Sequence, residues 1–130
     1  MNRPFEPIHT DQAPAAIGPY SQAVRAGELL FLSGQIPLDP ASGELVGGEI
    51  DAQITQAFDN LEAVARAAGG DLAHCVKINV YLTDLEDFSR VNAAMAERFA
   101  EPYPARAAVG VAALPKGAAV EVEAILRLPA

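Results

Sequence analysis

The sequence predicts an α+β domain in which two helices cover one face of a single sheet, with the element order β-β-α-β-α-β-β. Apolar residues recur every three to four positions in residues 50–68 and again in 84–99, as in α-helices. Residues 75–82 and 119–127 alternate between two kinds of side chain, as in β-strands. A chain of 130 residues suits one domain with one core, to which we assign residues 1–130.

The first third of the chain is expected to hold an irregular arm followed by two strands. Residues 1–18 are rich in proline, alanine and polar side chains, which is typical of an arm without regular structure. Strands are expected at 21–25 and 28–33, separated by a glycine-containing turn. Residues 28–33 are apolar on both faces, which favours a buried central strand, and residues 34–37 would end it.

The helices have clear ends. Gly69 and Gly70 stop the first helix, and the strand at 75–82 follows. Thr83 or Asp84 is a plausible cap for the second helix, and two prolines soon after residue 99 end it. The stripe that this second helix would bury comprises Phe88, Val91, Met95 and Phe99.

The last two strands are expected at 105–111 and 119–127, joined by a turn at residues 114–117. A period of two puts Ala107, Val109 and Val111 on one face of the first strand, and Arg106, Ala108 and Gly110 on the other. Our interpretation is that Arg106 shares a polar face with Glu121 and Glu123. The small neighbours of Arg106 would leave room there for a small anion.

Composition argues against several function classes. A net charge of −8 argues against nucleic acid as a partner, because phosphate binding needs a basic surface. No apolar stretch is long enough for a signal peptide or a membrane span, so no membrane partner is expected. Cys75 is the single cysteine, which suits a reducing compartment, and we expect a cytoplasmic protein in which Cys75 only packs. His9 and His74 lie in no metal-ligand motif, so no metal is expected.

The second face of the sheet has no helix to cover it. It combines Tyr81 and Ile125 with polar and small residues, which suggests that another subunit docks there. We therefore expect an oligomer with ligand sites at the subunit junctions.

Two interpretations of the charged residues stay open on pattern alone. Arg106 is either a solvated or ion-paired arginine, or a clamp for a carboxylate, to which a guanidinium offers a planar pair of donors. Glu123 is either a solvated carboxylate or one that lies near a cleft and orients a water molecule.

Many short segments, in one order along almost the whole chain, resemble the RidA/YjgF family of enamine/imine deaminases. The similar segments include Ala13-Pro14-Ala15-Ala16-Ile17-Gly18-Pro19-Tyr20-Ser21-Gln22-Ala23, Ser33-Gly34-Gln35-Ile36-Pro37, Val91-Asn92, Pro104-Ala105-Arg106, Leu114-Pro115-Lys116 and Val122-Glu123-Ala124. The resemblance implies a chorismate-mutase-like fold with one mixed sheet, and a homotrimer with active sites at the subunit clefts. It also implies hydrolysis of 2-imino acids, such as 2-iminobutyrate and 2-iminopropionate, to 2-oxo acids and ammonia, without cofactor or metal.

The resemblance also implies roles for individual residues. Arg106 would bind the substrate carboxylate, and Glu123 would position or activate the attacking water. Tyr20 and Ser33 would line the pocket as further catalytic residues, with Tyr20 as a proton donor or binder.

Three more positions would bind or support the substrate. Gly34 and Asn92 would shape the pocket, and the backbone carbonyl of Ala108 would meet the imine nitrogen. The chain reads Arg106-Ala107-Ala108 where many members have either Arg-Ser-Cys or Arg-Thr followed by a variable residue, and Met95 stands where an aromatic residue is frequent. These departures concern substrate preference more than the reaction.

Two alternatives use the same fold. One is a trimer that binds a small carboxylate, such as a 2-oxo acid, without catalysis. The other is a stress chaperone that acts through its acidic surface. A ribonuclease is less favoured because of the negative charge.

Overall fold

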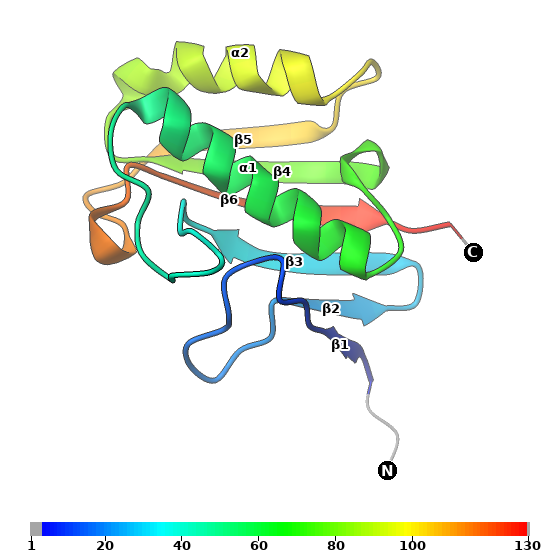
Figure 1. Ribbon diagram of the computed structural model, residues 1–130. Helices are drawn as coiled ribbons and strands as arrows, with labels where there is room; N and C mark the ends of the chain where they lie inside the picture. Colours follow the sequence, from blue (N-terminus) through cyan, green and yellow to red (C-terminus); the bar gives the residue numbers. More distant parts are fainter. Residues whose placement is uncertain (1–3, 130) are drawn as a thin grey trace.

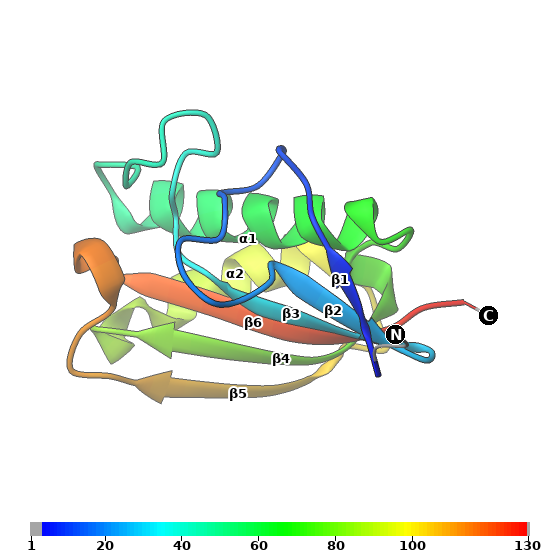
Figure 2. The same ribbon diagram turned by 90° about the horizontal axis from the view of Figure 1, so that it is seen from below.

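The computed structural model describes residues 4–129, in which two helices lie on one side of a six-stranded mixed sheet (Figures 1 and 2). The strand order is β1-β2-β3-β6-β4-β5, and β4 pairs parallel to β5 while every other pair is antiparallel. The expected α+β class with both helices on one face is therefore confirmed. The elements are β1 (Glu6–Ile8), β2 (Ala23–Ala26), β3 (Leu29–Gln35), α1 (Ile50–Ala67), β4 (Cys75–Leu82), α2 (Phe88–Arg98), β5 (Ala105–Gly110) and β6 (Val120–Arg127), with short 3-10 turns η1 (Leu72–His74), η2 (Leu85–Asp87) and η3 (Pro115–Gly117).

The core lies between α1 and the central strands. The apolar stripe of α1 includes Ile54, Phe58, Leu61 and Val64, which are fully buried and form one core with the buried side chains of β3, β4 and β6. Each large apolar side chain buried in this way contributes about 1.5–3 kcal/mol. Within residues 4–129, no helix is both long and apolar enough to cross a membrane.

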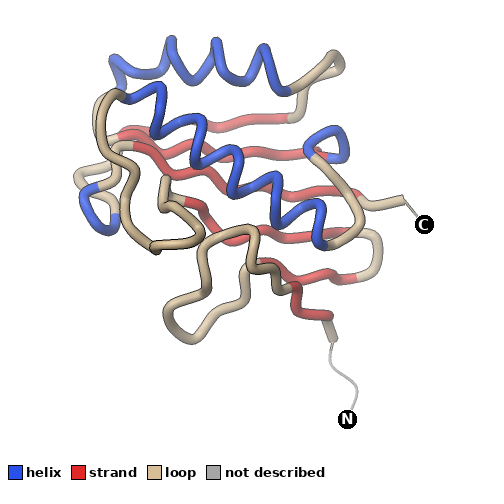
Figure 3. Tube along the Cα trace, viewed as in Figure 1, coloured by secondary structure: helices blue, strands red, loops and turns tan. Residues whose placement is uncertain are grey.

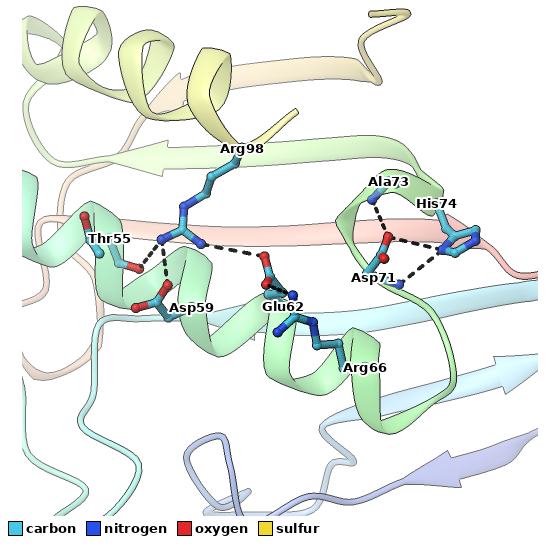
Figure 4. A network of polar contacts seen from close by, with 8 residues as sticks. All are labelled: Thr55, Asp59, Glu62, Arg66, Asp71, Ala73, His74 and Arg98. Atoms are coloured by element: carbon cyan, nitrogen blue, oxygen red, sulfur yellow. Dashed lines mark hydrogen bonds and ion pairs between the residues drawn. The ribbon is translucent and has the colours of Figure 1, made fainter. Parts of the chain in front are cut away.

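Polar contacts orient α2 relative to α1. Arg98 of α2 donates to Asp59 (2.6 Å) and to the carbonyl of Thr55 (3.3 Å), and lies 3.9 Å from Glu62 (Figure 4). Such partly exposed ion pairs are worth about 0–1 kcal/mol each, so the apolar stripe supplies most of the stability. In this arrangement α2 runs beside the edge strand β5, so that side chains of the two elements can meet (Figure 1).

The expectations at the N-terminal end of the chain need two corrections. Part of the expected irregular arm forms β1, an edge strand that pairs with β2 because Ile8 packs against the core. β3 extends through Gln35, into the expected break at residues 34–37, and it is not buried on both faces. Leu30 and Leu32 are buried under α1, whereas Phe31 is 40% exposed on the face without helices.

The last two strands are not neighbours, which corrects the expected shared face. β4 lies between β6 and β5, so that Ile78 pairs with Ala124 on one side and with Arg106 on the other. Arg106 and Ala108 therefore face the helices, whereas Ala107 and Val109 face the open side. Alternation fixes which residues of one strand share a face, but it does not say which strands lie next to each other.

Candidate functional site

Arg106 lies on the edge strand β5 with its side chain against α2. Its guanidinium stacks over the ring of Phe88, with the guanidinium carbon 4.8 Å from the ring centroid. Nη1 donates to Asn92 Oδ1 (2.5 Å) and contacts the sulfur of Met95 (3.7 Å). Among residues 4–129, nothing accepts a hydrogen bond from its Nε or Nη2. The arginine is thus held on one side and retains donors in the geometry that binds a carboxylate.

These donors border a cavity of about 450 Å³, which we call the arginine cavity. Asn92, Met95 and Ala96 of α2 form one wall, and Tyr103 and Pro104 form the approach to β5. One cation among mostly apolar walls suits a small organic anion. Asn92, which is predicted to support the substrate, accepts the hydrogen bond that fixes Arg106.

A second cavity of about 430 Å³ lies at the far end of β3 and the start of β6. We call it the glutamate cavity, since Glu121 is the one carboxylate that lines it among residues 4–129. Tyr20, Gly34 and Lys116 line it as well, and Ile36 adds an apolar wall. A Cβ at Gly34 would overlap the Glu121 carboxylate, so the glycine leaves room for this carboxylate in its present position.

Glu121 has a perturbed acidity in this cavity. Burial raises the pKa of its carboxyl above the ordinary value of 4.5, and the nearby charge of Glu123 raises it further. A carboxyl with a raised pKa is better suited to exchange protons near neutral pH.

Glu123 lies two residues further along β6 on the same open face, and its carboxylate is engaged. It accepts hydrogen bonds from the Tyr81 hydroxyl (2.5 Å) and the Asn79 amide (3.1 Å), both on β4. The hydrogen bond to Glu123 is the main reason why the pKa of Tyr81 rises to about 12. Of the two carboxylates that the sequence offered, Glu121 and not Glu123 therefore shares a cavity with Tyr20. Periodicity could not tell them apart, because both lie on one face.

Of the other predicted site residues, some border a cavity and others hold the segments around it. Tyr20 borders the glutamate cavity, and its hydroxyl accepts from the backbone N–H of Ile17 (3.3 Å). Ser33 donates its hydroxyl to the carbonyl of Ser21 (2.6 Å), so it fixes the segment that carries Tyr20. The side chain of Ala108 packs against the core, and its backbone belongs to the edge strand.

Within one chain, the two cavities lie apart. Arg106 faces the helices, and Glu121 faces the open side of the sheet. The strand β4 separates β5 from β6, which puts the two residues roughly 10 Å apart across the sheet alone. A small ligand cannot touch both groups of the same chain.

The described chain offers no cluster of metal-ligating side chains. In residues 4–129, no three His, Cys, Asp or Glu residues come together in a group that could hold a metal ion. Cys75 is half-buried, and burial raises the pKa of its thiol to about 11, so this thiol stays protonated and packs. His74 accepts a hydrogen bond from the backbone of Asp71 (3.1 Å) and so closes the η1 turn (Figure 4).

Comparisons with known proteins agree with this architecture. The family model described as Endoribonuclease L-PSP matches residues 10–127. The RutC family protein y4sK of Sinorhizobium fredii is 54% identical over 95% of this chain and 98% of its own length. The 2-iminobutanoate/2-iminopropanoate deaminase of Bos taurus is 51% identical over 91% of this chain and 86% of its own. The crystal structure of RidA from the Antarctic bacterium Psychrobacter sp. PAMC 21119 superposes with a TM-score of 0.91 at 53% identity, covering 95% of this chain and 99% of that one.

The family match covers the strands and helices that carry both cavities, and the sequence and structural similarity extend over nearly the whole chain. The chain therefore belongs to the RidA/YjgF family, whose model bears the description Endoribonuclease L-PSP.

Proposed function

We propose that this protein hydrolyses 2-imino acids, such as 2-iminobutyrate and 2-iminopropionate, to 2-oxo acids and ammonia. The observation that carries the proposal is the preorganised guanidinium of Arg106, whose free donors border an apolar cavity. A relative named for this activity, at 51% identity over most of the chain, supports the choice of substrate.

Arg106 would hold the substrate carboxylate through paired hydrogen bonds. Stacking on Phe88 and the bond to Asn92 already restrict its rotamers, so less conformational entropy is lost when the anion binds. A fixed carboxylate in turn fixes the adjacent electrophilic carbon of the C=N bond.

Glu121 is our candidate for the group that activates water. Water would attack the imine carbon and lose a proton to the carboxylate, and the C=N electron pair would move to nitrogen. That nitrogen would take up the proton from the Glu121 carboxyl, giving a neutral carbinolamine. The carboxylate would then accept the hydroxyl proton of the carbinolamine and pass it to nitrogen, so that the C–N bond breaks as the C=O bond forms and ammonia leaves. Acid–base assistance of this kind is worth about 10²–10⁴-fold.

Three further residues would support these steps. The Tyr20 hydroxyl borders the same cavity as Glu121 and could bind or deliver a proton. Gly34 leaves space for the carboxylate, and Ser33 fixes the approach to Tyr20. The edge position of β5 leaves the backbone near Ala108 accessible to the imine nitrogen.

A complete site would combine two chains, with the arginine cavity of one meeting the glutamate cavity of the next. The separation of Arg106 and Glu121 within one chain supports this arrangement, since a 2-imino acid is far too small to bridge them. The open sheet face, with Phe31 and Val109 exposed, offers apolar surface for the contact. A closed ring of three chains would give three equivalent sites.

The test follows the loss of freshly generated 2-iminobutyrate by trapping the remaining imine with semicarbazide. Wild type should accelerate the loss, and Arg106→Ala should not. Arg90→Ala is a matched control, because Arg90 pairs with Asp51 on the helix surface, away from both cavities. A folded Arg106→Ala protein with full activity would exclude the clamp. Binding of 2-oxobutyrate by wild type without imine turnover would favour the non-catalytic alternative.

A further inference from the structure

Buried polar side chains gather around the glutamate cavity. Among residues 4–129, three polar side chains are buried, namely Gln22 (2% exposed), Gln35 (6%) and Asn60 (1%). Gln22 and Gln35 line the cavity, and Asn60 bonds the backbone of Ile36 and Leu38, which also line it. Burying an amide costs free energy unless protein groups replace its hydrogen bonds with water. Three buried amides around one cavity therefore indicate that their hydrogen bonds hold this part of the structure.

Gln22 holds the wall that carries Tyr20. This wall is the long loop of residues 9–22 between β1 and β2 (Figure 3). The Gln22 amide oxygen accepts from the N–H of Thr10 (2.7 Å), and its nitrogen donates to the carbonyls of Thr10 (3.0 Å) and Pro14 (2.8 Å). One side chain therefore binds both the start and the middle of the loop.

The loop has few other internal bonds. Among described residues, one backbone–backbone hydrogen bond has both ends inside 9–22, from the N–H of Tyr20 to the carbonyl of Gly18 (2.9 Å). The Gln22 side chain thus supplies hydrogen bonds to the loop backbone that neighbouring strands would supply in a β-sheet.

Asn60 plays the matching part for the opposite wall. It lies on α1, and its amide nitrogen donates to the carbonyls of Ile36 (3.2 Å) and Leu38 (2.9 Å). Its own oxygen accepts from Gln56 one turn earlier (2.8 Å), which fixes the orientation of the amide. The irregular segment after β3 is thereby joined to the rigid helix.

We propose that Gln22 and Asn60 are positioning residues, which set the distance between the two loop walls of the glutamate cavity and so the placement of Tyr20 beside Glu121. The part of this inference that concerns turnover rests on the proposed imine hydrolysis. The part that concerns loop order stands on the contacts alone.

The test replaces each amide by an apolar side chain of similar size, in Gln22→Met and Asn60→Leu. Amide hydrogen exchange should rise in residues 9–21 for the first variant and in residues 36–48 for the second, with other segments as in wild type. The turnover number for 2-iminobutyrate should fall about 10- to 100-fold in each. Affinity for 2-oxobutyrate should change little, because Arg106 lies in the other cavity.

Asp71→Ala is the control, since it removes a side chain that accepts from the backbone of Ala73 (2.8 Å) at the opposite end of β4. It should raise exchange near η1 and leave turnover unchanged. If Gln22→Met does not fold, Gln22→Asn shortens the side chain and takes the amide out of reach of Thr10 and Pro14.

Wild-type exchange in the 9–21 and 36–48 segments of folded variants would overturn the proposal, and so would a rise spread evenly over the chain. Failure of the proposed function gives a different result. Wild type would then not hydrolyse the imine, while localised exchange in the variants would still support the positioning role.

Discussion

The arginine cavity and the glutamate cavity have nearly equal volumes, about 450 and 430 Å³, but they are built in different ways. The first is formed largely by a helix and an edge strand, and one stacking contact with one hydrogen bond holds its charged group. The second is bounded by loops, and buried amides hold its walls. Both charged groups lie on strands, but the comparison teaches that a cavity walled by a helix needs little further support, whereas a cavity walled by loops depends on contacts from distant parts of the chain.

The largest expected effect separates the two carboxylates of β6. Glu121→Gln should lower the turnover of 2-iminobutyrate about 10²–10⁴-fold, because the cavity loses its proton acceptor. Glu123→Gln should retain most of the activity, since Glu123 is engaged by Tyr81 and Asn79. Steady-state kinetics of both variants measure the difference. The opposite ranking would return the catalytic role to Glu123, as the sequence motif alone suggested.

Gly34→Ala should have the next largest effect. The added methyl group overlaps the Glu121 carboxylate and displaces it, so we expect a loss of about 10-fold or more in turnover. Overpacking of this kind also destabilises by about 1–3 kcal/mol, which denaturant titration would detect. Gly47→Ala is a matched control, because its Cβ would meet open space. Unchanged kinetics in Gly34→Ala would mean that the carboxylate need not occupy its present position.

Glu121 should also make stability depend on pH. Because its pKa is raised on folding, the folded state binds the proton more tightly than the unfolded state. This stabilisation is complete below the ordinary value of 4.5 and is lost as the pH rises through the folded value. Thermal unfolding should therefore show Glu121→Gln gaining stability relative to wild type from about pH 4.5 upward. A Glu121→Gln protein whose stability relative to wild type does not change with pH would contradict the assignment.

The smallest effect concerns Tyr81. In Glu123→Gln, the pKa of Tyr81 should fall from about 12 towards its ordinary value of 10, because the hydrogen bond to the carboxylate is the main cause of the rise. Ultraviolet titration of the three tyrosines would record this shift in one of them. Tyr81→Phe should remove the ionisation near pH 12 from the titration curve. If no tyrosine pKa falls in Glu123→Gln, the contact between Tyr81 and Glu123 does not persist in solution.

Local sequence patterns were sufficient for most of the fold. The spacing of apolar residues in α1 and the alternation in β4 and β6 depend on one element at a time, and each was predicted within a few residues. The short strand β1 was missed, since its pairing with β2 depends on a contact across the loop of residues 9–22.

The site could be predicted less fully, because it depends on which strands are neighbours. Alternation put Arg106 and Ala107 on opposite faces of their strand. Only the position of β4 between β5 and β6 shows that Arg106 is on the face that the helices cover. The choice between Glu121 and Glu123 likewise depends on Gly34 and Tyr20, which come from distant parts of the chain. No spacing within one strand contains that information.

The most direct test of the two-chain site mixes inactive subunits. Arg106→Ala and Glu121→Gln would be prepared separately, unfolded together in equal amounts and refolded, with each variant refolded alone as the control. If Arg106 of one chain works with Glu121 of its neighbour, about one quarter of the sites in the mixture are intact, and imine hydrolysis returns to about that fraction of wild type. A mixture of folded, co-assembled chains with no more activity than its components would contradict the account.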